Sequence, residues 1–184
     1  MDYIAFIAGL PEIAWDDRKL SLTVAEFREQ LKDYISGRDE RLIDLFFLPN
    51  DNAQVLRLLR KQEPDGALST VYPVKLLEDE IQEPDKTIPA YLREFITDFK
   101  EEHLRYDVSP ENVLSWMYYD YMMKADNQLV KRYAEFSMNL KNLVTALNAR
   151  KYGMEVAKEV GISQAQVSRL EKNALKIMRQ YLES

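Results

Sequence analysis

The sequence has no cysteine among its 184 residues, which excludes disulfides, thiolate metal sites and cysteine nucleophiles. It has one histidine, His103, which lies beside two glutamates and is more typical of a surface residue than of a catalyst. No glycine-rich phosphate-binding motif occurs. No spacing of His, Asp and Glu indicates a metal site. We therefore predict a non-enzymatic protein without a cofactor or a metal.

Long apolar runs are also missing. The longest near the N-terminus, Tyr3–Pro11, is far too short to cross a bilayer, and Asp2 stands where a signal peptide would need positive charge. The sequence therefore predicts no membrane insertion and a cytoplasmic location. Hydrophobic residues make up 46% and charged residues 30% of the chain, which is typical of a soluble globular protein.

Strand patterns are almost absent, and apolar residues recur at helical spacing, so we predict an all-α fold. Thr23 and Glu26 form a capping box for a helix that runs to about Tyr34, and Gly37 is expected to end this helix. A second helix is expected to stop before Pro49, because the residue before a proline disfavours helical geometry. The three residues that follow, Asn50–Asn52, are then expected to cap a third helix.

Further helices are expected over 74–81, over 90–104 and from Ser109, which is a good N-cap before Pro110. Residues 63–73 read as a loop. The apolar segment Tyr3–Leu10 fits either a buried strand or a short helix, since its length does not decide between them. An aromatic group in the Ser109 helix is compatible with core packing or with a partner surface; its members are Trp116, Tyr118, Tyr119 and Tyr121.

A heptad-like apolar seam follows, with alternating steps of four and three residues. Such a helix packs lengthwise against other helices, either within the chain or on a partner. The seam consists of Leu129, Tyr133, Phe136, Leu140, Leu143 and Leu147.

The segment Met154–Lys172 has the layout of a helix-turn-helix. Gly161 supplies the turn, and Ser163 with Gln166 forms a capping box for the second helix. We expect the apolar stripe of the second helix to pack back on the first helix; it consists of Val167, Leu170, Ala174, Ile177 and Met178. A helical hairpin that only ends the fold would use the same glycine and serine for capping.

The polar side of this second helix could bond base edges and phosphates in a major groove. The predicted DNA-binding residues are Ser163, Gln164, Ala165, Gln166, Ser168, Arg169, Lys172 and Lys176.

The residues GISQAQVSRLEKNALKIMRQYL resemble region 4 of bacterial sporulation-type sigma factors, and the likeness covers residues 154–182. The resemblance implies recognition of the promoter −35 element, with double-stranded DNA and RNA polymerase as partners. Gln164, Ala165, Ser168 and Arg169 would face bases, and the later basic residues would serve phosphates or packing. The chain departs from that family upstream, where the preceding helical pair and the −10-binding region are not found.

A second resemblance covers residues 1–160 through YIAFIAGLPEI, FFLPNDN and NLKNLVTALNARKYGMEVAKEV. These stretches are similar to a bacterial family encoded beside V-type ATPase subunits. The resemblance implies a non-catalytic helical part of a rotary ATPase, binding V-type ATPase subunits through the body. The two resemblances overlap in residues 154–161, so the chain reads as a fusion made in nature or in the laboratory.

Charge is distributed unevenly along the chain. Residues 151–184 carry six basic and four acidic side chains, a net charge of +2. Residues 1–150 then hold 19 basic and 27 acidic side chains, a net charge of −8. We therefore predict an acidic helical body, 1–150, and a helix-turn-helix tail, 151–184. An acidic body repels DNA, so DNA binding is expected at the tail.

Overall fold

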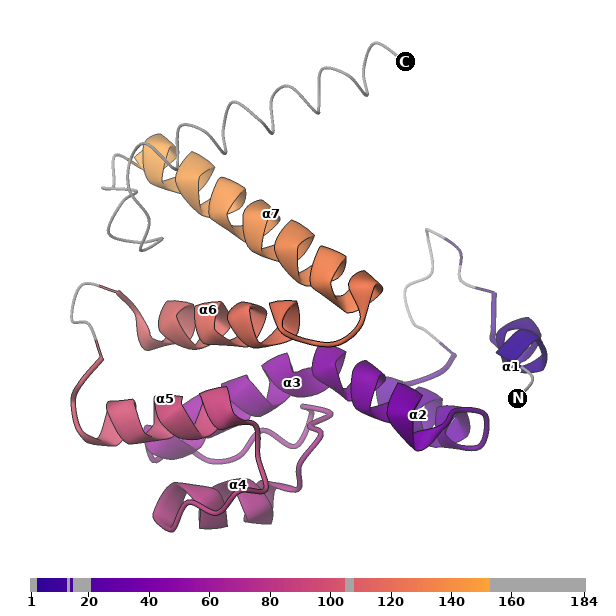
Figure 1. Cartoon of the computed structure of the whole chain (residues 1–184), viewed down its shortest axis with the longest axis horizontal. Coiled ribbons are helices and arrows are strands. Elements are labelled where there is room, and N and C mark those ends of the chain that lie inside the picture. The colour runs from indigo at the N-terminus through magenta and orange to yellow at the C-terminus, as the bar shows by residue number, and fades with distance from the viewer. Residues whose placement is uncertain (1–2, 13, 15–20, 105–107, 153–184) are drawn as a thin grey trace.

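Helices make up the regular structure of the chain in a computed structural model that describes residues 3–12, 14, 21–104 and 108–152. No strand occurs within these ranges, so the prediction of an all-α fold is confirmed (Figure 1). The predicted helix-turn-helix lies outside the described residues. The helices are α1 (Tyr3–Gly9), α2 (Val24–Lys32), α3 (Gly37–Leu59), α4 (Val74–Gln82), α5 (Ala90–Lys100), α6 (Pro110–Met123) and α7 (Gln128–Tyr152).

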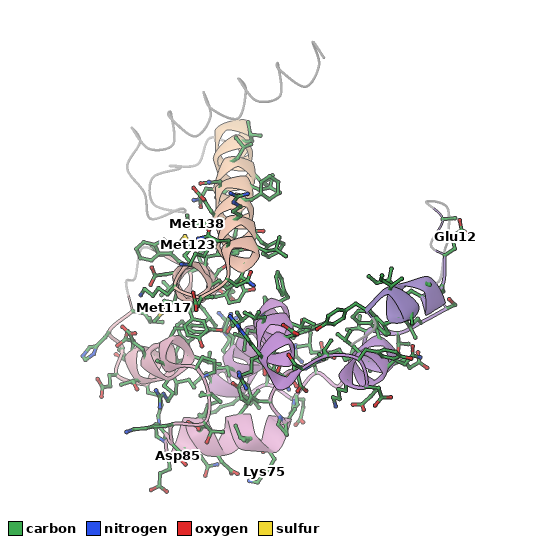
Figure 2. All side chains as sticks on the ribbon, turned by 45° about the vertical axis from the view of Figure 1, so that its right-hand side comes forward. Glu12, Lys75, Asp85, Met117, Met123 and Met138 are labelled. Atoms are coloured by element: carbon green, nitrogen blue, oxygen red, sulfur yellow. The ribbon has the colours of Figure 1, made fainter. Side chains whose placement is uncertain are left out.

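Helix α3 is the central element. It packs against α4, α5 and α6, and α6 in turn packs against α7 (Figure 1). Figure 2 labels Met138 of α7 and Met117 and Met123 of α6, the two helices that pack against each other. The core lies between the helices and contains the fully buried side chains of Val55, Leu77, Leu92, Phe95, Ile96, Leu114, Met122, Val130 and Ala134.

The helix starts predicted at Thr23 and Ser109 are confirmed. Thr23 and Glu26 form the capping box of α2. The Ser109 hydroxyl accepts a hydrogen bond from the Asn112 backbone N–H at 3.3 Å, at the start of α6. Asn127 accepts hydrogen bonds through Oδ1 from two N–H groups of the first turn of α7. Local polar side chains thus fix where these helices begin.

The prediction that Gly37 ends a helix is wrong, because Gly37 begins α3. Helix α2 has already ended at Lys32. The Ser36 hydroxyl accepts a hydrogen bond from the Asp39 backbone N–H at 3.3 Å, which makes Ser36 the N-cap and Gly37 the first helical residue. The glycine therefore follows a start signal that we had not assigned.

The prediction of a helix break at Pro49 is also wrong, because α3 runs through it from Gly37 to Leu59. A proline inside a helix has no N–H for the carbonyl four residues earlier, here that of Leu45. The Tyr118 hydroxyl of α6 donates a hydrogen bond to this carbonyl oxygen at 2.9 Å. A tertiary contact therefore replaces the missing helical bond.

The prediction that Asn50–Asn52 cap a helix is wrong. These three polar residues lie within α3 and bind other segments. They hold the 63–73 loop and α5 against the helix. The Asn50 amide donates to the Ser69 carbonyl at 2.9 Å, the Asp51 carboxylate accepts from the Val71 and Tyr72 N–H groups at 2.9 Å each, and Asn52 Oδ1 accepts from the Tyr91 hydroxyl at 2.7 Å.

The segment Tyr3–Leu10, left open between strand and helix, forms the short helix α1. Its Phe6 ring lies 5.8 Å from that of Phe27 and 5.0 Å from that of Tyr34. The Tyr3 hydroxyl donates to the Asp39 carboxylate at 2.6 Å. Helices α1 and α2 therefore attach to the N-terminal end of α3, away from α5 (Figure 1).

Candidate interaction surface

Helix α7 leads from the core to the predicted tail, and one of its faces is docked on α6. Val130 and Ala134 are buried on this face, and Met138 is half-buried. The Lys141 ammonium donates to the Ser115 hydroxyl of α6 at 2.6 Å. This docked face anchors the helix to the body.

A second face of α7 is apolar and exposed. Its side chains are between 45% and 73% exposed, although their spacing predicts a packed seam. At about 100° per residue, this face lies roughly a third of a turn from the docked face. Leu143 of the predicted seam is half-buried, and Val144 lies on the exposed face instead. The apolar face of α7 consists of Leu129, Tyr133, Phe136, Leu140, Val144 and Leu147.

The apolar face begins beside α3 and continues towards the C-terminal end of α7. The Tyr133 ring packs edge-on against the Phe46 ring at 4.9 Å between centroids, which fixes the first turns of α7 on the body. An exposed apolar strip with helical spacing is the kind of surface that receives another amphipathic helix. Apart from Tyr133, its members are aliphatic or phenyl side chains, which is the composition of an interface.

A small cleft lies between α6 and α7 beside the docked face. It has a volume of about 30 Å³ and is lined by Asn112, Ser115, Trp116, Tyr119 and Lys141 among others. A space of this size holds one or two waters and no substrate. Burial lowers the pKa of Lys141, and the hydrogen bond to Ser115 uses its ammonium group. The cleft therefore belongs to the helix contact.

The predicted aromatic group divides between core and surface. Tyr118 is buried and Tyr121 half-buried, and both stack near Tyr91 of α5. Tyr119 is half-buried and stacks on Tyr118, whereas Trp116 is 61% exposed. Core packing thus explains the tyrosines, and Trp116 remains as a surface aromatic.

Asp51 is a buried acid in α3, one of the three residues predicted to cap a helix. Burial raises its pKa to about 6, although N–H donors from Val71 and Tyr72 oppose this shift. Both carboxylate oxygens are used by the loop that they hold, so this acid has a structural role. The neighbouring Gln54 leaves its Nε2 buried without a partner. In the sequence, these buried polar contacts are indicated by three polar residues, Asn50–Asn52, that directly follow a proline within a helix.

Among the described residues, no group of three or more His, Cys, Asp or Glu side chains could hold a metal ion. His103 lies 3.2 Å from Glu101 with 65% of its side chain exposed, which confirms its prediction as a surface residue. None of the described helices combines the length and the apolar character needed to cross a membrane. The predicted DNA-binding residues, Ser163 to Lys176, lie outside the described residues.

The family comparison covers the body and most of the tail. A family model described as "protein of unknown function (DUF2764)" matches residues 1–176. The chain belongs to the DUF2764 family. The match passes through residues 154–161, where we expected a junction, without ending there. Sequence typical of DUF2764 proteins therefore extends well into the predicted helix-turn-helix.

A shorter match concerns transcription. A 29-residue segment is 76% identical to the RNA polymerase sigma-G factor of Clostridium acetobutylicum. The segment covers 16% of this chain and 11% of that factor. Its length equals that of the predicted sigma-like stretch, 154–182. No solved structure matches the chain. The likeness to a sigma factor is thus supported, whereas the link to a V-type ATPase stays a prediction.

Proposed function

We propose that this DUF2764 protein binds promoter-type DNA through its tail, in the manner of sigma region 4, on an otherwise helical, non-enzymatic body. The observation that supports the proposal is the 76% identity to a sigma factor over 29 residues. The predicted cytoplasmic location and RNA polymerase as a second partner of the tail are part of this proposal.

In this function each predicted residue has a separate role. Gln164 and Arg169 read base edges, because their side chains form paired hydrogen bonds with adenine and guanine. Ser163 and the N-terminus of its helix hold a phosphate, since free N–H groups and the helix dipole attract anions there. Lys172 and Lys176 contribute charge. The acidic body limits affinity, because its net charge of −8 repels the duplex at low salt.

The test measures fluorescence anisotropy of the whole chain on a −35 duplex and on a scrambled duplex at two salt concentrations. We expect preference for the −35 duplex and weaker binding at higher salt. Arg169→Ala should cost about 1–3 kcal/mol on the preferred site. Arg132→Ala removes the same charge from an exposed position of α7 and should change little. Equal binding to both duplexes would refute the proposal.

A second candidate function is a structural subunit associated with a V-type ATPase, binding stalk subunits through the body. The observation that favours it is the outer side of α1, where Ile4 is 79% and Ile7 65% exposed. These residues lie in YIAFIAGLPEI, one of the stretches that carry the resemblance. Exposed isoleucines on a helix that is attached to α2 and α3 form a small apolar surface for a partner.

This candidate is tested with purified stalk subunits of the matching rotary ATPase and the whole chain. We expect co-elution on size exclusion with the wild-type protein and loss of co-elution with Ile4→Asp/Ile7→Asp. Val24→Asp is the matched control, because Val24 is a 50% exposed apolar residue on α2. Failure of the wild-type chain to bind any stalk subunit would eliminate this function.

A further inference from the structure

The apolar face of α7 has a specific order of steps. Read from Leu147 back to Tyr133, successive members lie three, four, four and three residues apart. Helical rise makes this part of the face about 21 Å long. A helix that covers it in the antiparallel direction needs apolar residues at the same steps along its own sequence.

The predicted second helix of the tail has these steps. From Val167 to Tyr181, apolar residues follow one another at three, four, four and three residues. The stripe is again about 21 Å long, whereas the preceding predicted helix of about six residues spans only about 9 Å. The first helix of the tail is therefore too short to cover the stripe. The five members are Val167, Leu170, Ala174, Met178 and Tyr181.

We propose that residues 163–182 of the tail return antiparallel to α7 and cover its apolar face. The register pairs Leu147 with Val167, Leu140 with Ala174 and Phe136 with Met178. The large Phe136 and Leu140 thus meet a flexible methionine and a small alanine, which lets the side chains interdigitate. This inference goes beyond DNA binding and does not depend on it.

The connection and the charges favour the chain's own tail as the occupant. Only ten residues, 153–162, separate the end of α7 from the predicted second helix of the tail. Gly153 and Gly161 lie near the two ends of this connection. Such a tether gives the tail a millimolar effective concentration at the face, well above that of a second molecule. The tail carries +2 and the body −8, so their attraction adds to the apolar contact.

Docking through the stripe determines which side of the tail helix points outward. At about 100° per residue, Arg169, Lys172 and Lys176 lie on the opposite side from the stripe. The covered side is apolar and the free side is basic. The tail can therefore complete the fold and still present these three basic residues to DNA.

The test uses the absence of cysteine from the 184-residue chain. Leu140→Cys/Ala174→Cys places two thiols at a predicted contact, and a short bis-maleimide reagent joins them if they lie close together. We expect an intrachain cross-link whose yield does not change with protein concentration. Peptide mass spectrometry after proteolysis identifies the joined positions. DNA is absent, so the result is independent of the proposed function.

The control pair is Glu135→Cys/Lys172→Cys, in which both positions lie away from the proposed contact. It should give little intrachain product. A second pair, Phe136→Cys/Met178→Cys, tests the register one turn away, and adding Leu140→Asp should reduce its cross-linking several-fold. Equal yields from the test and control pairs would overturn the proposal. Cross-links formed only between chains would overturn it as well, because they would assign the face to a second copy.

Discussion

At the scale of single residues, the contact between Tyr118 and the Leu45 carbonyl explains how α3 tolerates a proline. Removing the hydroxyl with Tyr118→Phe leaves a carbonyl without a donor, which should lower the free energy of unfolding by about 1–3 kcal/mol. Pro49→Ala supplies the missing backbone N–H, so Tyr118→Phe should cost less in that background. Urea unfolding of the four proteins in this double-mutant cycle measures the difference.

Tyr119→Phe is the matched control, because Tyr119 is half-buried on the same helix and stacks on Tyr118. It should change stability only slightly. If Tyr118→Phe costs the same with proline and with alanine at position 49, the hydroxyl does not compensate for the proline.

Asp51 should make stability depend on pH in the acidic range. Its pKa is about 6 in the folded state, because burial disfavours the charge more than the N–H donors of Val71 and Tyr72 and the charge of Arg28 favour it. The ordinary pKa of an unfolded aspartate is about 3.9. The folded state therefore binds the proton more tightly. Protonation of Asp51 therefore stabilises the folded state. This contribution to the free energy of unfolding is fully present below about pH 4 and is lost as the pH rises through about 6, a change on the order of 2–3 kcal/mol.

The measurement compares urea unfolding of the wild type and of Asp51→Asn between pH 4 and pH 7. The free energy of unfolding of the wild type should fall relative to that of the variant over this range. The exposed Asp120→Asn serves as the control and should follow the wild type. A difference that stays constant or rises with pH would contradict a raised pKa.

At the scale of elements, Arg28 joins α2 to the rest of the body. Its guanidinium donates to the Asp44 carboxylate at 2.9 Å and to the Thr70 carbonyl at 2.8 Å, and it lies 4.5 Å from the centre of the Phe47 ring. Lysine keeps the charge but loses the planar fork. Arg28→Lys should therefore cost about 1–3 kcal/mol, seen as faster amide exchange throughout α2.

The matched control is Arg38→Lys at an exposed position near the start of α3. It should leave exchange in α2 unchanged. Equal acceleration of exchange in α2 and in α5 would mean that the substitution destabilises the whole body, and that Arg28 does not specifically attach α2.

Local patterns predicted the elements that local side chains determine. The starts of α2 and α6 were predicted because Thr23 and Ser109 cap helices with their own neighbours. The continuity of α3 was not predicted, because the donor that replaces the Pro49 N–H comes from Tyr118, far along the chain. Helical spacing likewise identified an apolar seam on α7, but it did not tell which of two faces docks on α6. Sequence thus gives the boundaries that neighbouring side chains determine, and it misses those that depend on a distant partner.

At the scale of the whole molecule, the candidate site joins a described helix to a tail predicted from sequence. The apolar residues of α7 were identified from their periodicity, and the structure adds that they are exposed. Because these side chains are exposed, we interpret the seam as an interaction surface. The predicted DNA-binding residues come from motif and resemblance, and their arrangement depends on how the tail packs. The two proposals can therefore be tested together.

The protein cross-linked through Leu140→Cys/Ala174→Cys should bind the −35 duplex as well as the same variant before cross-linking. The reason is geometric, because the stripe and the basic residues lie on opposite sides of the predicted helix. Fluorescence anisotropy at two salt concentrations should give the same affinity and the same salt dependence for both forms. The cross-linked form should also prefer the −35 duplex to the scrambled one.

The matched comparison adds Arg169→Ala to the cross-linked protein, which should weaken binding to the −35 duplex by about 1–3 kcal/mol, as in the free chain. If cross-linking abolishes DNA binding, the tail leaves α7 when it binds DNA, and the docked form is an inhibited state. If both forms bind alike and Arg169→Ala weakens both, the tail recognises DNA while it completes the helical body.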